Sequence, residues 1–313
     1  MDICVTGGAG YIGSAAVKRL CDDGHTVIVI DNLSKGIQRL VDHRAEFYNL
    51  DLTDRERLDD VFAAHNIDAV MHFASYKAVG ESMRDAPKYS DNITGTICLL
   101  DAMVKHDVKR IIYSSSAAVY GLAQNEMVTE HDPTVPINYY GYSKLAAEEI
   151  IIWYARIHEI TYVSLRYFNV AGDAGLMYRD PAPENILPII MEAVSGTRDK
   201  VVVFGDDYDT RDGTGVRDYI DINDLVEAHV LAMAKGDNQI INLGTSQGSS
   251  VMELITAVRR VTGKEVPYEI GDRREGDPAT LLASNEKAQD VLGWAPQRDI
   301  DTMIRSMMDV YFA

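Results

Sequence analysis

One tyrosine in the chain is spaced to act as a base. Tyr140 is the only one of the 17 tyrosines that is followed four residues later by a lysine, Lys144. On the helix expected over 143–156, this spacing places both side chains on one face. A tyrosine titrates at a pH of about 10, and a neighbouring ammonium stabilises its phenolate. The pair therefore predicts a base that works near neutral pH; the alternative is an ordinary contact on the surface of a helix.

A serine at the end of a predicted strand is the expected partner of this base. Ser114, Ser115 and Ser116 lie at the end of the apolar run 109–114, and Ser116 precedes Tyr140 by 24 residues. A hydroxyl there can bond a substrate hydroxyl and shorten the path of its proton to the phenolate. Serines at strand ends also cap turns. We expect Ser114 to cap and Ser116 to take part in the chemistry.

A glycine-rich turn after the first predicted strand is typical of a dinucleotide site. Gly7, Gly10 and Gly13 lie between an apolar run and an amphipathic helix, and Asp31 ends the second apolar run. The glycines let the backbone approach a pyrophosphate, which the N-terminus of the helix stabilises. The carboxylate of Asp31 would bond the adenosine ribose and repel a 2′-phosphate, which predicts NAD rather than NADP. Without a ligand, the segment would be a plain strand, turn and helix with an exposed aspartate.

Two further strand ends fall at the same edge of the expected sheet. Asp51 ends the third apolar run, and the segment 72–75 ends the fourth. Ligands of open α/β sheets bind at the carboxyl ends of the strands, where Asp51 would reach the adenine amino group. Asp51 is equally well placed to cap the N-terminus of the following helix.

Alternating strands and helices must position these residues. Short β-branched runs, expected as parallel strands joined by helices, cover 3–6, 26–30, 45–50, 69–73, 109–114 and 161–166. Beyond Asn169 the loops 172–175, 181–183 and 205–215 separate helical patterns over 185–195, 222–234, 251–261 and 300–310. The pattern predicts an α/β fold, in which residues 1–168 form a Rossmann-type doubly wound parallel sheet. Residues 169–313 are expected to form a smaller mixed α/β lobe that exchanges segments with the first.

Composition narrows the classes of function. The chain of 313 residues has a net charge of −18, which argues against nucleic acid or an anionic membrane as a partner. Cys4, Cys21 and Cys98 match no spacing of metal ligands and are expected as buried residues in a reducing cytoplasm. The first residues do not resemble a secretory signal, and no apolar run approaches the ~18 residues that span a bilayer. We expect a cytoplasmic protein without a metal.

The order of these motifs resembles the extended short-chain dehydrogenase/reductase superfamily. Further segments resemble the family of UDP-galactose 4-epimerases, and the likeness runs from residue 1 to about residue 295. The segments are 7–13, 72–82, 114–121, Arg166-Tyr167-Phe168-Asn169, 213–220 and Arg273-Arg274-Glu275-Gly276-Asp277-Pro278. The resemblance implies interconversion of UDP-glucose and UDP-galactose through a transient 4-keto sugar, with NAD as the bound cofactor. It makes Tyr140 the base, with Lys144 on the nicotinamide ribose and Ser116 assisting.

The resemblance also implies the residues that bind each ligand. Those for NAD are Gly7, Gly10, Tyr11, Ile12, Gly13, Asp31, Asn32, Asp51, Leu52, Phe73, Ala74, Lys77, Asn92, Tyr140, Lys144 and Tyr167. Those for the UDP-sugar are Ser116, Tyr140, Phe168, Asn169, Asn185, Phe204, Arg217, Arg274 and Asp277. An acidic protein must meet a pyrophosphate with local cations, and a guanidinium bonds phosphate through two donors. Arg217 and Arg274 fit that need, although each taken singly is an ordinary surface arginine.

Some finer properties follow only from the resemblance. Leu281 lies where side-chain bulk is associated with accepting or excluding N-acetylated sugars. A homodimer is implied through the helices expected near 86–105 and 143–158.

Several rival functions share this fold. A nucleotide-sugar 4,6-dehydratase would need a carboxylate pair after the serine, where this chain has Ala117 and Ala118. A 4-epimerase of UDP-N-acetylhexosamines, UDP-pentoses or UDP-uronates would share the catalytic set. A non-catalytic NAD-sensing protein would normally have lost the tyrosine or the lysine, and both are present.

Overall fold

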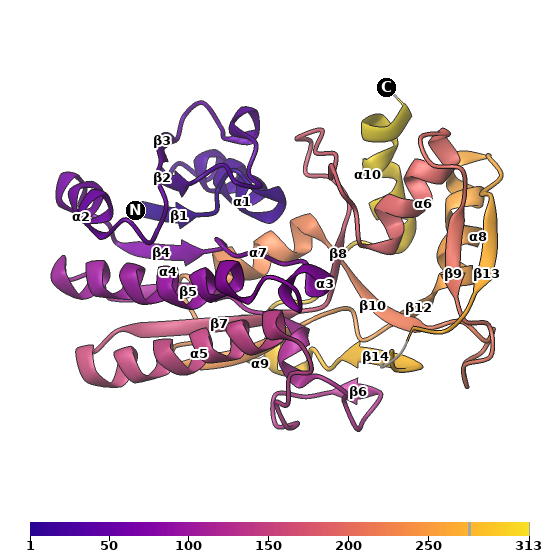
Figure 1. Ribbon diagram of the computed structural model, residues 1–313. Helices are drawn as coiled ribbons and strands as arrows, with labels where there is room; N and C mark the ends of the chain where they lie inside the picture. Colours follow the sequence, from indigo (N-terminus) through magenta and orange to yellow (C-terminus); the bar gives the residue numbers. More distant parts are fainter. Residues whose placement is uncertain (275–276, 313) are drawn as a thin grey trace. The chain divides into compact units, whose positions relative to one another are not determined.

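The chain divides into two compact units (Figure 1). The computed structural model describes residues 1–274 and 277–312. The first unit comprises residues 1–121, 134–166 and 226–241, and the second comprises residues 122–133, 167–225 and the chain from Asn242 onward. Each unit is therefore assembled from segments that are distant in the sequence.

A seven-stranded sheet forms the centre of the first unit. Its strands, in spatial order, are β11 (Gln239–Leu243), β7 (Thr161–Tyr167), β5 (Arg110–Ser114), β4 (Ala69–His72), β1 (Asp2–Thr6), β2 (Thr26–Asp31) and β3 (Glu46–Asn49). The pairings among the last six are all parallel. The chain winds outward from β1 in both directions, which creates the change of strand order at which such sheets bind ligands. All six predicted strands are confirmed, and β11 adds a seventh.

Helices flank this sheet because its central strands are apolar on both faces. They are α1 (Tyr11–Asp22), α2 (Arg55–Ala64), α3 (Val79–Ser82), α4 (Ala86–Lys105), α5 (Tyr139–His158) and α7 (Ile222–Ala232), with short 3₁₀ turns η1 (Gln38–Leu40) and η2 (Ala117–Tyr120). In Figure 1, α4 and α5 run side by side along the sheet. Ile28, Phe62, Leu99 and Ile111 are buried in the core that these helices share with the strands.

The second unit is a mixed α/β lobe. The order β12 (Gly248–Ser250), β10 (Val216–Asp221), β14 (Thr280–Ala283) and β6 (Met127–Val128) forms one sheet, β8 (Asn169–Ala171) pairs with β10, and β9 (Val201–Phe204) pairs with β13 (Tyr268–Gly271). The helices are α6 (Ile186–Ser195), α8 (Val251–Thr262), α9 (Glu286–Leu292) and α10 (Ile300–Phe312), of which α6, α8 and α10 pack together. The predicted fold class is confirmed.

The three cysteines lie inside the fold. Cys4, Cys21 and Cys98 are free and buried, as predicted. Within residues 1–274 and 277–312, no helix is long and apolar enough to cross a membrane. Over the same residues, no group of three or more His, Cys, Asp or Glu side chains is arranged to hold a metal ion.

Candidate active site

Tyr140 and Lys144 lie in the first two turns of α5. The amide of Asn138 caps this helix by accepting a hydrogen bond of 2.8 Å from the N–H of Gly141. The buried Nζ of Lys144 lies 6.0 Å from the centre of the Tyr140 ring and donates to the carbonyl of Ser114 at 2.8 Å. The helical spacing thus places the phenol and the ammonium together, as the sequence predicts.

Ser116 joins this pair from the end of β5. Its hydroxyl bonds the phenol of Tyr140, and its Oγ accepts from the N–H of Ala118 at 3.2 Å. The Oγ of Ser116 keeps a second lone pair as well as its own proton, so either hydroxyl can be the donor in the bond to Tyr140. Ser116 is therefore also the cap of η2. The cap of η2 is thus Ser116 and not Ser114, which was expected to cap, and the carbonyl of Ser114 accepts from Lys144.

Burial governs the protonation of these groups. It raises the pKa of the Tyr140 phenol above its usual value, and the hydrogen bond from Ser116 offsets part of that rise. Burial also lowers the pKa of Lys144 to about 7, although the nearby carboxylate of Glu148 raises it. The chain alone thus keeps the phenol protonated. A further positive charge beside Tyr140 is needed before it can act as a base near pH 7.

The glycine-rich turn between β1 and α1 is shaped by close backbone contacts. A Cβ on Gly7, which has φ of +72°, would lie 2.6 Å from the N atom of Ala74, and one on Gly13 would lie 2.1 Å from the carbonyl oxygen of Gly7. A Cβ on Gly10 would meet only that same oxygen, at 3.3 Å. Gly7 and Gly13 are therefore required by the fold of the turn itself, and the backbone at Gly10 stays open to a ligand. This cradle fits a dinucleotide pyrophosphate.

Asp31 and Asp51 lie at the ends of β2 and β3. The Asp31 carboxylate accepts from the N–H of Ala9 at 3.0 Å and from that of Leu33 at 2.8 Å, and burial raises its pKa. Asp51 accepts from the side-chain amide of Asn32 at 2.7 Å. Asp31 thus holds the glycine-rich turn, and the structure brings Asn32 and Asp51 together as predicted cofactor residues.

The helix after β3 is not capped by Asp51. The cap of α2 is Asp54, which accepts from the N–H of Arg57 at 3.2 Å. Asp51 accepts instead from the N–H and hydroxyl of Thr53, in a turn before the helix. The capping alternative for Asp51 is therefore wrong.

The loop after β4 holds further predicted cofactor residues. The Phe73 ring packs on His229 with centroids 4.8 Å apart, and the backbone of Ala74 lies against Gly7. The Asn92 amide accepts from the N–H of Tyr76 at 2.8 Å and donates to its carbonyl at 3.1 Å, so Asn92 fixes this loop to α4. Contact of Asn92 with NAD stays a prediction. The remaining positions are Tyr11 and Ile12 at the start of α1, the half-buried Leu52, and the exposed Lys77.

The predicted substrate residues of the second unit form two contacting pairs. The Arg274 guanidinium lies 3.9 Å from the centre of the Phe204 ring, and an Arg217 nitrogen lies 3.4 Å from an oxygen of Asp277. Leu281 of β14 is paired in register with Arg217 of β10. The pairing of β10 with β14 and these two side-chain contacts thus link five positions. In the sequence these positions lie up to 77 residues apart, from Phe204 to Leu281. Glu275 and Gly276 of this motif lie outside the described residues.

The other predicted residues of this unit lie on β7, β8 and the approach to α6. Tyr167 and Phe168 are half-buried, and the amide of Asn169 donates to the carbonyl of Asp218 at 3.0 Å. Asn185 immediately precedes α6, but its exposed side chain makes no capping hydrogen bond. The side chain of Asn185 is therefore not needed to begin the helix.

Residues 3–244 match the model of the NAD dependent epimerase/dehydratase family. The chain belongs to this family. The match spans both the glycine-rich turn and the Tyr140–Lys144 pair, so the resemblance inferred from the motifs is confirmed.

Relatives within the family are similar to this chain over nearly their whole length. A UDP-glucose 4-epimerase of Lacticaseibacillus casei is 47% identical over 98% of this chain and 95% of its own. The structure of a UDP-glucose 4-epimerase from Brucella ovis in complex with NAD superposes with a TM-score of 0.94 at 40% identity, over 97% of this chain and 96% of the other. One from Bifidobacterium longum in complex with NAD⁺ and UDP gives 0.92 at 40%, over 99% and 98%.

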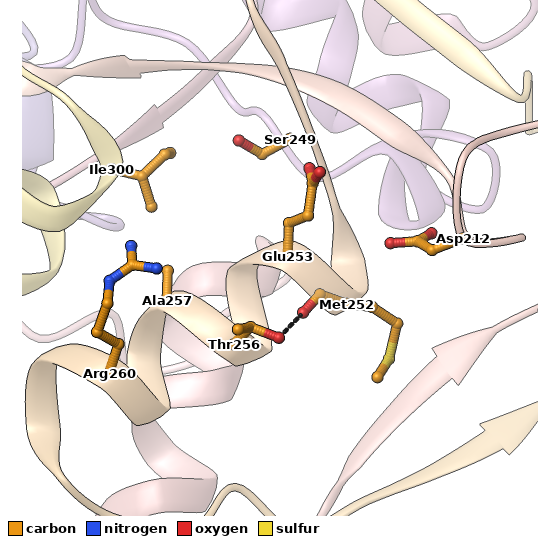
Figure 2. A pocket seen from close by; sticks show the side chains of 8 residues that line it. All are labelled: Asp212, Ser249, Met252, Glu253, Thr256, Ala257, Arg260 and Ile300. Atoms are coloured by element: carbon orange, nitrogen blue, oxygen red, sulfur yellow. Dashed lines mark hydrogen bonds between the residues drawn. The ribbon is translucent and has the colours of Figure 1, made fainter.

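A groove on the second unit lies outside this set of family residues. Figure 2 shows it along α8, with Asp212, Glu253 and Arg260 among the side chains around it. Its volume is about 470 Å³, and the described residues that line it include none of the predicted site residues. Glu253 pairs with Arg211, and Arg260 pairs with Asp301, so the charges at this groove have protein partners.

Two buried charges of the family site were missed by motif reasoning. Glu148 follows Lys144 by one helical turn, and its carboxylate accepts from Nε of Arg166 at 2.9 Å and from Nη2 at 2.6 Å. Both side chains are buried. A carboxylate four residues after a lysine is also common on exposed helix surfaces. Only the burial of Glu148 distinguishes it from such a surface residue.

Proposed function

We propose that this protein is an NAD-dependent 4-epimerase that interconverts UDP-glucose and UDP-galactose. The observation that carries the proposal is the meeting of Tyr140, Lys144 and Ser116 at the end of β5, in the same unit as the glycine cradle at Gly10. Similarity to UDP-glucose 4-epimerases over nearly the whole chain supports it.

The chain's own residues move the proton of the substrate. NAD, when bound, supplies a positively charged nicotinamide that accepts a hydride from C4 of the sugar and returns it. Tyr140 takes the proton of the C4 hydroxyl, and Ser116 bonds the same hydroxyl and shortens the transfer. A base at pH 7 requires the Tyr140 pKa to lie ~3 units, or ~4 kcal/mol, below its ordinary value, and burial adds to that demand. The charges of Lys144 and the nicotinamide meet it together.

A hydride returned to the opposite face of the 4-keto sugar would invert C4. Oxidation and reduction would then cancel, so no external oxidant would be needed. The sugar must turn over between the two steps, so substrate binding depends mainly on the UDP group.

The second unit supplies the residues for that group. We assign the pyrophosphate to Arg217 and Arg274, the uracil to Phe204, and the ribose hydroxyls to Asp277. Phosphate would replace Asp277 as the partner of Arg217, because a guanidinium bonds phosphate through two donors. Asn169, Asn185 and Phe168 are assigned to the sugar nucleotide, and Tyr167 to the cofactor.

We also propose a homodimer located in the cytoplasm. Trp153 and Ile157 are four residues apart on α5, and 60% and 66% of their surfaces are exposed. Large exposed apolar side chains on one helix face favour association with a second copy. Size-exclusion chromatography with light scattering tests the homodimer, and a monomer would contradict it.

Incubation with UDP-galactose, UDP-N-acetylgalactosamine and UDP-xylose, without added NAD, tests the function. We expect UDP-glucose from UDP-galactose, because the cofactor stays bound. Conversion of only the N-acetylated or the pentose substrate would place the chain among the related 4-epimerases. A 6-deoxy-4-keto product would indicate the dehydratase, which Ala117 and Ala118 argue against, and no conversion would indicate a non-catalytic NAD-binding protein.

A further inference from the structure

The serine run 114–116 meets three successive turns of α5. The carbonyl of Ser114 accepts from Lys144 at 2.8 Å. The hydroxyl of Ser115 donates to Glu148 at 2.5 Å, and the hydroxyl of Ser116 bonds Tyr140. Tyr140, Lys144 and Glu148 are each four residues apart and therefore share one face of the helix. The placement of the two proposed catalytic groups is thus tied to that of a buried carboxylate.

The carboxylate is held in turn by an arginine from β7. Arg166 donates to Glu148 through Nε and Nη2, and its Nη1 donates to the hydroxyl of Tyr120 at 3.0 Å. Tyr120 is the last residue of η2, the turn that Ser116 caps. The Glu148–Arg166 pair therefore connects α5, β7 and the turn that carries the assisting serine.

We propose that Glu148 and Arg166 are positioning residues that hold Lys144 and Ser116 around Tyr140 and balance the charge beneath them. The inference rests on the proposed role of Tyr140 as the base. Neither Glu148 nor Arg166 is assigned a contact with the substrate or cofactor. They act through the groups that are.

The groups that face Lys144 explain why this balance matters. They are His72 of β4, Tyr113 of β5, and Tyr140 and Glu148 of α5 itself, and Arg166 of β7 pairs with Glu148 behind them. Burial, assisted by the charge of Lys144, lowers the pKa of His72 to about 3, so His72 is neutral at pH 7. Glu148 is the anion that supports the Lys144 ammonium, whose pKa lies at about 7. A change of one neighbouring charge therefore alters the protonated fraction of Lys144 most strongly near neutral pH.

Opposite charge changes in the pair give the sharpest test. The pH dependence of kcat is measured for the purified holoenzyme with UDP-galactose. Glu148→Gln removes a negative charge, so Lys144 and Tyr140 release their protons more readily and the profile moves to lower pH, by about one unit. Arg166→Met leaves the carboxylate uncompensated, so the profile moves to higher pH by a similar amount.

Three further variants separate charge from packing. The double variant Glu148→Gln/Arg166→Met removes both charges, and we expect its profile to return close to that of the wild type. Arg166→Lys keeps the charge but loses the planar fork, so kcat falls by about 10-fold without a shift of the profile. Tyr120→Phe removes only the hydroxyl that accepts from Arg166 and should leave the profile in place. Retained NAD content and circular dichroism establish folding for each.

Two results would overturn the inference. One is a loss of kcat in both single variants with an unshifted profile, or with shifts in the same direction. The other, which applies even where a single variant does not fold, is an unchanged kcat in Arg166→Lys. Turnover by a Tyr140→Phe variant would instead remove the proposed base. An inactive Tyr140→Phe variant together with unshifted profiles would remove the positioning pair alone.

Discussion

The predicted site residues of the two units are held in different ways. In the first unit, Lys144 is buried and Ser116 is bonded to both the backbone and the base, so each group has a fixed partner. In the second unit, Arg217 faces Asp277, of which 43% of the side chain is exposed, and Arg274 lies over the partly exposed Phe204. The first arrangement presets the geometry of a reaction, whereas the second can exchange a protein partner for a ligand.

The ion pairs Glu148–Arg166 and Arg217–Asp277 also differ in the free energy that they contribute. Breaking a buried pair such as Glu148–Arg166 leaves an uncompensated charge and costs about 3–5 kcal/mol. A partly exposed pair such as Arg217–Asp277 contributes about 0–1 kcal/mol. Arg217 can therefore leave Asp277 at small cost, but a change in the charges beneath Lys144 costs a large part of the stability of the fold.

Removal of the phenol oxygen should have the largest effect. We expect Tyr140→Phe to lower kcat by about 10³-fold or more, because the only assigned proton acceptor is lost while the ring is kept. The measurement is turnover of UDP-galactose together with NAD content, which should not change. Tyr142→Phe is the matched control, since this exposed tyrosine lies half a turn away and has no assigned role. Near-normal turnover of Tyr140→Phe would show that the preset geometry serves something else.

The same contrast decides what the sequence could reveal. The central strands of the first unit, β1, β2, β4 and β5, are buried on both faces, so their apolar runs are visible without the structure. β6 and β14 are only two and four residues long and pair across more than 150 positions of the chain. No periodicity can emerge in such short strands, and local patterns cannot show that residues 122–133 belong to the second unit.

Within the site, the spacing of residues along a helix could be interpreted from the sequence. The choice of which of several neighbouring residues caps a turn or helix could not. The four-residue spacing of Tyr140 and Lys144 translates directly into proximity on α5. The capping roles expected for Ser114 and considered for Asp51 fall instead to Ser116 and Asp54, because a shift of a few residues decides which oxygen faces the free N–H groups. The importance of Glu148 could not be seen, because its buried partner lies on another element.

The comparison of ion pairs predicts a large difference in stability. Glu148→Gln should lower the free energy of unfolding by about 3 kcal/mol or more, since it strands the Arg166 guanidinium in the core. Asp277→Asn should lower it by less than about 1 kcal/mol. Urea unfolding of both variants at one NAD concentration measures the two values. Equal losses would mean that the Glu148–Arg166 pair is not the more tightly held of the two.

The two arginines of the second unit should affect substrate binding more than turnover. We expect Arg217→Met and Arg274→Met each to raise KM for UDP-galactose by about 10-fold to 100-fold, as a lost charge-assisted hydrogen bond costs about 1.5–3 kcal/mol. Arg260→Met is the control, because Arg260 pairs with Asp301 at the groove of Figure 2 and has no assigned ligand. An unchanged KM in both test variants would remove the pyrophosphate from these positions.

The smallest predicted effect is a change in the pH dependence of stability. Burial lowers the pKa of Lys144 from 10.5 to about 7 on folding. Between these values the unfolded chain binds the additional proton, so this lysine makes the folded state gain stability as pH rises, by at most about 1.4 kcal/mol per pH unit. Lys144→Met removes that contribution. The difference in free energy of unfolding between wild type and variant, measured in urea from pH 7 to pH 9 at one NAD concentration, should therefore grow in favour of the wild type. Parallel curves would mean that the ammonium is solvated in the folded chain, and the contrast between the buried Lys144 and the more accessible binding arginines would then fail at its central residue.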